Sequence, residues 1–409
     1  MHINKCCRIC GNQNLTKVLD LGSQPLANAF LCEKDLTDTE PLCPLEMYIC
    51  SDCHLAQLIH IVDKETLFSD YIYFSSGMPK LSEHFRQYAE DVINRFLKDR
   101  DLVVELGSND GTLLQFFKDR RFRPLGIDPA KNITIVANVH GIPTITDFFT
   151  ESIAVQIVKN AREAKVIIGN NVVAHINDYQ DLGRAIKVLL HPEGVFVFEA
   201  PYLVDMFENL KFDTIYHEHL SYLAINPLTY LFKQFNLEIF EVQHVQAQGQ
   251  SIRVFVGHVG AHPIDASVAA CLKKESSIGL DKLESYDNLA EKVFECKMKV
   301  VKLLRELKAQ GKRLAVYGAP AKGNTILNYY DVGRSFFDFA LDELPSKQGH
   351  YTPGAHLLVV DRKMAEKNPP DYYFLLAWNY LPIIMEKEKT FLSNGGAFIL
   401  PTGEILRDS

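Results

Sequence analysis

Residues 102–111 read Leu-Val-Val-Glu-Leu-Gly-Ser-Asn-Asp-Gly, an apolar run that ends in a turn with two glycines. The run predicts a buried strand over 102–106, and the residues after it predict a helix over 112–120. A second apolar run predicts a strand over 124–128. Strand, helix and strand in this order form a β-α-β unit.

The same alternation continues along the chain. Strands are predicted over 164–169 and 194–199, with a helix over 179–190 between them. The pattern predicts an α/β fold with a doubly wound, mostly parallel sheet. In such sheets the ligand site lies beyond the carboxyl ends of the strands.

The turn after the first strand indicates what the ligand is. It contains neither G-x-G-x-x-G nor G-x-x-x-x-G-K-[ST], and its carboxylates disfavour a phosphate, so NAD and ATP are poor candidates. Asp128, about 20 residues on, is placed to accept hydrogen bonds from a ribose. An adenosine with a cationic centre, S-adenosylmethionine, fits both features. The donor-site candidates are Glu105, Gly107, Asn109, Asp110, Gly111 and Asp128, with Asp147 and Phe148 beside adenine and Asn170 at the methionine end. The alternative is a turn that merely joins a strand to a helix in another α/β enzyme.

The cysteines cluster near the start of the chain. Seven of the nine precede residue 54, and four of them form two C-x-x-C pairs, Cys7 with Cys10 and Cys50 with Cys53. Two such pairs complete the tetrahedral sulfur shell that structural zinc prefers. The alternative is a set of unrelated buried or redox thiols.

Composition and charge exclude several classes of protein. The 409 residues are 47% hydrophobic and 23% charged, which predicts a soluble globular protein of two or three domains. A net charge of -8 gives no reason to expect nucleic-acid binding. No apolar run is long enough to span a membrane and no signal peptide is evident, so a cytoplasmic location without membrane attachment is predicted. The oligomeric state is not determined by the sequence, and a monomer is favoured.

The catalytic candidate is the stretch 213–222, Asp-Thr-Ile-Tyr-His-Glu-His-Leu-Ser-Tyr. Histidine suits a general base near neutral pH, and tyrosine can stabilise an oxyanion. His175 follows the fourth strand and should open onto the same ligand site, while Tyr71 and Tyr73 are candidates to cover it. The alternatives are a surface loop with capping polar residues for the stretch, a structural role for His175 and core packing for the two tyrosines.

The C-terminal third begins with a long helix or helix pair over about 267–310. Residues 312–324 then predict a strand, a small-residue turn and a helix start, which indicates a second Rossmann-like unit. Lys322 and the later Lys347 would favour an anion such as a phosphate there. The alternative is a domain that only packs.

These motifs, in this order, resemble the zinc-containing, S-adenosylmethionine-dependent C-methyltransferases that act on nucleotide-linked 4-keto deoxysugars. The resemblance covers nearly the whole chain. It rests on the two cysteine pairs, on Leu-Gly-Ser-Gln-Pro-Leu-Ala-Asn-Ala-Phe at 21–30, on the turn at 105–111, on Glu-Ala-Pro-Tyr at 199–202, on Tyr-His-Glu-His at 216–219, on Tyr-Gly-Ala-Pro-Ala-Lys-Gly-Asn at 317–324 and on Lys-Gln-Gly-His-Tyr-Thr-Pro-Gly at 347–354.

The resemblance implies a zinc-binding domain at 1–68, a central methyl-donor domain at 69–262 and a Rossmann-like domain at 263–409 that holds a nucleotide-sugar. It also implies that a base removes the proton beside the C4 ketone, commonly so that C3 becomes methylated, and that the enolate carbon attacks the donor methyl. His219 is the favoured base, with His217 and Tyr216 as alternatives; Glu218 would orient it. Tyr216, Tyr222 and His175 would hold the oxygen, with Tyr71 or Tyr73 closing over the sugar. The substrate-binding candidates are Tyr202, Lys322, Asn324, Lys347, His350 and Tyr351. Alternatives are an O- or N-methyltransferase on a related sugar nucleotide and a non-catalytic, zinc-organised S-adenosylmethionine-binding protein.

Overall fold

The computed structural model describes residues 1–68, 75–77, 79–245 and 251–408. The chain divides into two compact units, each assembled from separate stretches of sequence. Unit 1 contains 1–16, 49–204 and 220–281, and unit 2 contains 17–48, 205–219 and 282–409. The chain therefore passes from one unit to the other five times. Tyr71 and Tyr73, predicted to cover the sugar, lie outside the described residues.

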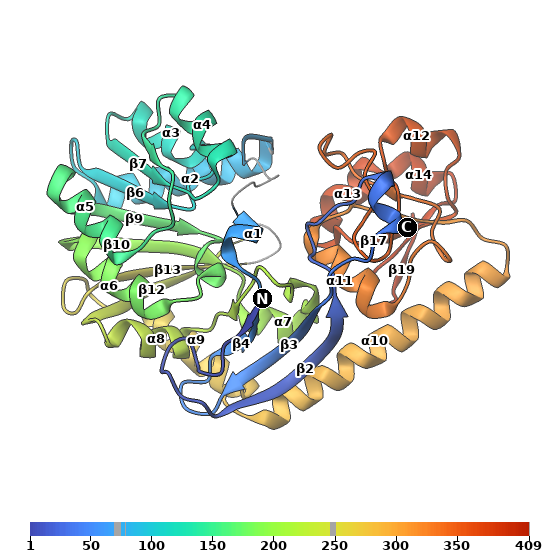
Figure 1. Cartoon of the computed structure of the whole chain (residues 1–409), viewed down its shortest axis with the longest axis horizontal. Helices are drawn as coiled ribbons and strands as arrows, with labels where there is room; N and C mark the ends of the chain where they lie inside the picture. Colours follow the sequence, from blue (N-terminus) through green and yellow to red (C-terminus); the bar gives the residue numbers. More distant parts are fainter. Residues whose placement is uncertain (69–74, 78, 246–250, 409) are drawn as a thin grey trace. The chain divides into compact units, whose positions relative to one another are not determined.

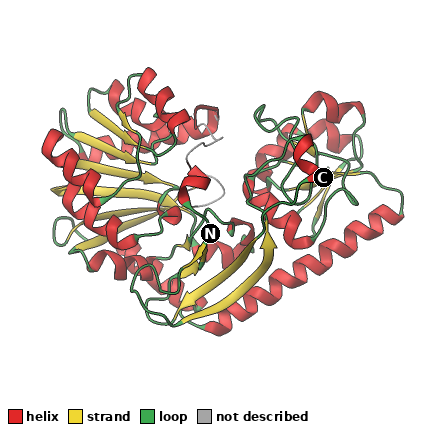
Figure 2. Ribbon diagram, viewed as in Figure 1, coloured by secondary structure: helices red, strands yellow, loops and turns green. Residues whose placement is uncertain are grey.

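Unit 1 is built on a seven-stranded sheet with helices on both faces (Figures 1 and 2). The strand order is β12-β13-β10-β9-β6-β7-β8. Neighbours from β10 to β8 are parallel, whereas β13 runs antiparallel to β10 and to β12. The strands are β6 (Leu102–Leu106), β7 (Arg123–Ile127), β8 (Thr144–Ile145), β9 (Ala164–Asn170), β10 (Leu190–Ala200), β12 (Leu237–Val245) and β13 (Ser251–His258).

The helices of this unit follow the predicted alternation. They are α1 (Lys64–Phe68), α2 (Pro79–Phe96), α3 (Thr112–Asp119), α4 (Lys131–Val139), α5 (Glu151–Ala161), α6 (Tyr179–Leu189), α8 (Ile225–Lys233) and α9 (Ala266–Ile278), with α7 (Leu203–Asn209) leading into unit 2. The predicted parallel α/β sheet is confirmed. The predicted bounds of the helices and strands differ from those in the structure mainly at β10, which starts four residues before the predicted strand.

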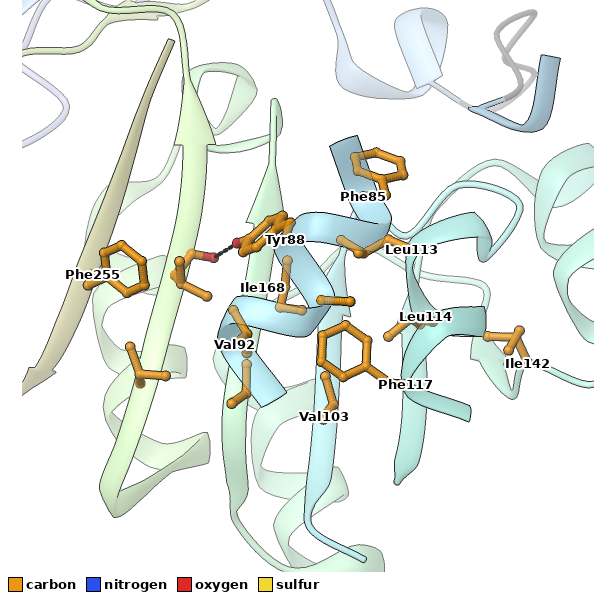
Figure 3. Packing of buried hydrophobic residues seen from close by; sticks show 14 of the residues in the cluster. Phe85, Tyr88, Val92, Val103, Leu113, Leu114, Phe117, Ile142, Ile168 and Phe255 are labelled. Atoms are coloured by element: carbon orange, nitrogen blue, oxygen red, sulfur yellow. Dashed lines mark hydrogen bonds between the residues drawn. The ribbon is translucent and has the colours of Figure 1, made fainter. Parts of the chain in front are cut away.

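Helix α2 covers one face of the sheet (Figure 3). Phe85, Tyr88 and Val92 project from α2 into a buried apolar cluster with Val103 of β6 and Ile168 of β9. The Tyr88 hydroxyl donates a hydrogen bond of 3.3 Å to a carbonyl of β10. This packing brings the first turns of α2 to the carboxyl ends of the strands, where a ligand site is expected.

The predicted zinc-binding segment, residues 1–68, forms most of two small sheets. A four-stranded sheet has the order β11-β4-β3-β2, and β1 pairs with β5. The strands are β1 (His2–Ile3), β2 (Leu15–Gln24), β3 (Cys43–Cys50), β4 (Ala56–Leu58), β5 (His60–Ile61) and β11 (Ser221–Tyr222).

Unit 2 contains a six-stranded, mainly parallel sheet in the order β16-β15-β14-β17-β18-β19. Only β19 is antiparallel to its neighbour among these described strands. The strands are β14 (Leu314–Tyr317), β15 (Ala340–Leu341), β16 (Val359–Val360), β17 (Tyr372–Leu375), β18 (Ala397–Ile399) and β19 (Ile405–Leu406), and the helices are α10 (Leu283–Ala309), α11 (Ala321–Tyr330), α12 (Arg362–Lys367), α13 (Leu381–Lys387) and α14 (Lys389–Ser393). The predicted second Rossmann-like sheet is therefore present. Among the described helices, none is long and apolar enough to cross a membrane.

Candidate functional site

Four cysteine sulfurs converge in unit 1. The Sγ atoms of Cys7, Cys10, Cys50 and Cys53 all lie within 4.8 Å of one another. Each pair is held in a tight turn, and a left-handed residue follows each second cysteine, Gly11 at φ 73° and His54 at φ 59°. The Cys53 thiol lowers the pKa of Cys7 to about 5 by hydrogen bonding. Four convergent sulfurs fit a closed tetrahedral zinc site, which would stabilise this segment without an open position for chemistry.

Arg8 anchors the first cysteine turn to β4 and to the loop after β9. Its guanidinium donates to the Leu58 carbonyl at 2.5 Å, to Gln57 Oε1 at 3.0 Å and to Asn177 Oδ1 at 3.1 Å. Burial lowers the pKa of the Arg8 guanidinium to about 10. Arg8 therefore joins the zinc segment to β4 and to the loop after β9, which carries His175.

The loop after β6 has the backbone that a close ligand approach requires. Gly107, Asn109 and Gly111 have φ values of 61°, 50° and 79°, so three of five residues are left-handed. A Cβ atom on Gly107 would lie 3.1 Å from Val172. The backbone nitrogen of Asn109 donates to Asp128 Oδ2 at 3.0 Å, which fixes the loop against the end of β7.

Polar side chains of this loop are held by the segment before α2. Asn109 Oδ1 accepts from the Ser75 backbone nitrogen, and Asp110 Oδ2 accepts from that of Ser76, both at 2.9 Å. Glu105 is 3% exposed and its Oε2 has no hydrogen-bond partner among the described residues. Burial, reinforced by Asp128 and Asp110, raises the pKa of Glu105. An unpartnered buried carboxyl oxygen beside a strained loop fits a cationic ligand group.

The remaining predicted donor residues follow the neighbouring strands. Asp147 and Phe148 come after β8, and the Lys64 ammonium lies 4.0 Å from the centre of the Phe148 ring. Asn170 ends β9, and both polar atoms of its side chain are buried without a hydrogen-bond partner in the described chain. The contacts of Asp147 and Phe148 with adenine, and of Asn170 with the methionine end of S-adenosylmethionine, stay predictions.

The catalytic candidates Tyr216 to His219 belong to unit 2 and form a turn, in which the His219 nitrogen donates to the Tyr216 carbonyl at 2.9 Å. His219 Nδ1 lies 2.8 Å from the Thr214 carbonyl, so Nδ1 carries the proton and donates. Nε2 is then the acceptor, 2.8 Å from the Tyr216 hydroxyl. Burial lowers the pKa of His219 to about 4. The result is a neutral imidazole of fixed tautomer, with its basic nitrogen against a phenol.

His217 and Glu218, which lie between Tyr216 and His219, have separate partners. His217 Nε2 lies 3.1 Å from the Cys43 carbonyl, and Glu218 Oε1 accepts a 2.6 Å hydrogen bond from Asn28 Nδ2. His217 is therefore occupied by backbone, whereas Glu218 is held by a side chain from residues 27–31, which we call the linking segment.

The linking segment also lies against three of the six predicted substrate-binding residues. Asn324 Nδ2 donates to the Ala27 carbonyl at 2.7 Å, and Tyr351 exchanges two backbone hydrogen bonds with Leu31. The Lys347 ammonium lies 5.4 Å from the Phe30 ring. Within unit 2, the linking segment thus connects Glu218 with three of these candidates.

Two lysines, the buried Lys347 and the half-buried Lys322, supply positive charge in the same unit. Lys347 donates to the Ala319 carbonyl at 2.7 Å and lies 3.8 Å from Asp342. Burial lowers the pKa of Lys322, and the nearby Asp213 opposes that change. Asp213 accepts a 2.7 Å hydrogen bond from the indole of Trp378. Another substrate-binding candidate, His350, has its Nδ1 atom buried without a partner in the described chain.

Three other candidates lie in unit 1. Tyr202 is buried and donates to Glu275 at 2.7 Å, so its hydroxyl is used inside the fold. The Tyr222 hydroxyl is buried without a partner among the described residues, and burial raises its pKa well above the usual value. His175 packs edge-on against Phe68, with 5.6 Å between ring centres.

Comparison with known proteins accounts for the order of these features. Residues 7–68 match a family of zinc binding domains, residues 81–242 match a methyltransferase domain, and residues 246–402 match the C-methyltransferase C-terminal domain. The C-methyltransferase NovU of Streptomyces niveus is 37% identical over 400 residues, which cover 97% of this chain and 95% of that relative. The chain belongs to the C-methyltransferase family. It is a methyltransferase that uses S-adenosylmethionine and carries a four-cysteine zinc site.

Solved structures similar to this C-methyltransferase are more remote. A methyltransferase in complex with the Haloferax volcanii Trm112 methyltransferase activator is 14% identical, and the alignment covers 45% of this chain and 93% of that chain with a TM-score of 0.36. Magnesium protoporphyrin IX methyltransferase of Synechocystis with bound SAH is 10% identical, and the alignment covers 43% of this chain and 83% of that chain with a TM-score of 0.35.

Some contacts could not be found from sequence patterns. Arg8 lies between two cysteines and Asn28 lies in a family motif, but neither position reveals its partner. His84 and Arg253, which both bind Glu199, stand outside every motif. Their partners are distant in the chain, so only the folded structure brings them together.

Proposed function

We propose that this C-methyltransferase methylates a carbon, commonly C3, of a nucleotide-linked 4-keto-6-deoxysugar. The observation that carries the proposal is the state of His219, a neutral imidazole with Nε2 2.8 Å from the Tyr216 hydroxyl. Forming a carbon nucleophile requires a base and a hydrogen-bond donor for the resulting oxyanion, and this pair supplies both. Transfer to oxygen or nitrogen does not require removal of a carbon-bound proton.

In the proposed reaction, His219 Nε2 takes the proton from the carbon beside the ketone. The C–H electron pair moves into the enolate, whose oxygen accepts a hydrogen bond from Tyr216. When bound, S-adenosylmethionine supplies an electrophilic methyl group on a sulfonium. The enolate carbon forms the new C–C bond as the methyl–sulfur bond breaks, which restores the ketone and leaves S-adenosylhomocysteine. Glu218, held by Asn28, would orient the turn. Tyr222 and His175 are proposed as further groups that bind the ketone or enolate oxygen of the substrate.

The nucleotide would bind unit 2 in this proposal. Lys347 is buried and Lys322 is half-buried, and a diphosphate would place favourable negative charge next to both ammonium groups. Asn324, His350 and Tyr351 would hold the nucleotide from the elements that contact the linking segment, and Tyr202 remains a proposed substrate residue. The reaction is proposed to take place in the cytoplasm, in agreement with nine cysteines that form no disulfide.

The test uses a panel of nucleotide-linked 4-keto-6-deoxysugars in D₂O, with and without S-adenosylmethionine. Mass spectrometry and NMR follow deuterium at the carbon beside the ketone and the site of the new methyl group. We expect deuterium uptake without the donor and a carbon-bound methyl group with it. His219→Gln should abolish both signals, whereas the exposed His140→Gln should retain them.

Two results would overturn the proposal. A new methyl group on oxygen or nitrogen would assign an O- or N-methyltransferase. Failure of every sugar in the panel to exchange or gain a methyl group, by an enzyme shown to bind S-adenosylmethionine, would exclude this acceptor class.

A further inference from the structure

A buried charge cluster lies at the carboxyl end of β10, and none of its residues was predicted as a site residue. Glu199 is 2% exposed, and its Oε1 accepts hydrogen bonds from Arg253 Nε at 2.9 Å and from Arg253 Nη2 at 2.7 Å. His84 Nε2 lies 3.0 and 2.8 Å from the two Glu199 oxygens. The Arg253 guanidinium also lies 3.8 Å from the centre of the Tyr88 ring. One carboxylate thus holds both an arginine and a histidine in place.

Strand register places this cluster beside the donor loop. Glu199 pairs with Asn170 of β9, and Glu105 of β6 pairs with Ile168. Side chains alternate along a strand, and Ile168 packs under α2, so Asn170 projects on the face that α2 covers. The same alternation places Glu105 and Glu199 on this face, because Val103 and Val197 two residues earlier also pack under α2.

Helix α2 brings His84 to the same edge of the sheet. The segment just before α2 is hydrogen-bonded to Asn109 and Asp110 of the donor loop. His84 is in the second turn of α2, one residue before Phe85, which packs on the sheet near the top of the helix (Figure 3). Its side chain is 20% exposed, compared with 7% for Arg253 and 2% for Glu199. His84 is therefore the member of the cluster that a ligand can reach.

Unpartnered polar atoms indicate that a ligand belongs here. Glu105 Oε2 and both polar atoms of the Asn170 amide are buried without a hydrogen-bond partner in the described chain. Buried polar atoms are nearly always paired, so these three are expected to bind a ligand or ordered water. An unpartnered carboxyl oxygen calls for a donor, whereas an amide offers both a donor and an acceptor.

The methionine end of S-adenosylmethionine carries an ammonium and a carboxylate. The acidic donor loop suits the ammonium but would repel the carboxylate, which needs a cationic donor. We propose that His84, as an imidazolium whose Nε2–H donates to Glu199, donates its Nδ1–H to this carboxylate, with Asn170 beside it. Glu199 and Arg253 are positioning residues, because Glu199 fixes the imidazole by Nε2 and Arg253 holds Glu199. The inference concerns the donor alone and does not depend on the sugar acceptor.

The test compares S-adenosylhomocysteine with its decarboxylated analogue, S-adenosyl-3-thiopropylamine, by calorimetric titration without any sugar. Wild-type protein should bind S-adenosylhomocysteine more tightly. His84→Ala should weaken that binding by roughly 10- to 100-fold, the usual range for a hydrogen bond to a charged group, and should leave the analogue unchanged. His84→Gln should lose less, because its amide still donates. His140→Ala, an exposed histidine change, should alter neither affinity.

Two results would overturn the assignment. Equal weakening of both ligands would mean that His84 only supports the fold, and unchanged affinity for both would mean that it does not touch the donor. Circular dichroism checks that each variant is folded, and His84→Gln serves as the test if His84→Ala is not. Because no acceptor is present, failure here is distinct from failure of the sugar proposal.

Discussion

Acidification should destabilise unit 2 through His219. Burial lowers the pKa of this imidazole to about 4 in the folded protein, compared with about 6.5 in an unfolded chain. The folded state therefore binds fewer protons than the unfolded state between these values. The contribution of the neutral His219 to the free energy of unfolding is fully present above pH 6.5 and is lost as the pH falls toward 4.

The magnitude follows from the same two values. A difference of about 2.5 in pKa between the folded and unfolded states changes the free energy of unfolding by about 3.4 kcal/mol once His219 is protonated in both states. About 2 kcal/mol of this free energy of unfolding should be lost between pH 7 and pH 5. Other histidines and carboxyl groups also titrate in this range, so the quantity of interest is the difference between wild type and a variant that lacks the His219 imidazole.

The assay uses the single tryptophan of the chain. Trp378 belongs to unit 2 and donates to the buried Asp213, so its fluorescence reports the unfolding of the unit that contains His219. Urea unfolding at a series of pH values should give a shallower pH dependence for His219→Gln than for wild type. His140→Gln, at an exposed histidine in unit 1, should keep the wild-type slope. Equal slopes for wild type and His219→Gln would refute the reasoning, because His219 would then titrate alike in both states.

Three further predictions concern zinc, a helix cap and a positioning contact. Purified protein should hold about one zinc per chain, and metal analysis of Cys10→Ser should find less than half of that; retention of full zinc would contradict a four-sulfur site. Glu275 accepts hydrogen bonds from the first two backbone nitrogens of α8 and from the Tyr202 hydroxyl. Glu275→Ala should therefore lower the free energy of unfolding of unit 1, measured by circular dichroism, by about 3 kcal/mol. A loss no larger than that of the exposed Lys273→Ala would show that these hydrogen bonds do not stabilise the unit. Asn28→Ala should reduce kcat roughly tenfold without changing the affinity for S-adenosylhomocysteine, since it removes the contact that holds Glu218; unchanged kcat would show that the contact does not matter for turnover.

The sequence predicts the parts of the structure that depend on local patterns. The apolar run before Gly107 predicts β6, and the glycines after it predict the left-handed loop, because these features depend on neighbouring residues. The cysteine spacing predicts the zinc cluster, since two pairs at this spacing have few other uses. The segment after Asp213 is identifiable from its density of polar residues.

The remaining contacts depend on packing between distant segments. His84 and Glu199 are separated by 115 positions, and Asn28 and Glu218 by 190. No local pattern links such residues, because the sheet register and helix packing bring them together. The tautomer of His219 is likewise set by the Thr214 carbonyl, which only the turn brings within reach. A motif therefore predicts which residues do the chemistry more readily than it predicts what holds them.

The cysteine pairs have a topological consequence for the folding of the chain. Cys7 and Cys10 precede residues 17–48 and Cys50 and Cys53 follow them, while these intervening residues belong to unit 2. A bound ion would cross-link the two ends of a loop, with 40 positions between Cys10 and Cys50. By analogy with a disulfide, closing a loop of that size reduces the entropy of the unfolded chain by an amount equivalent to about 4 kcal/mol. Zinc held in unit 1 would thus limit the conformational search of a segment that folds into unit 2, so that metal loading before folding should speed recovery of both units together.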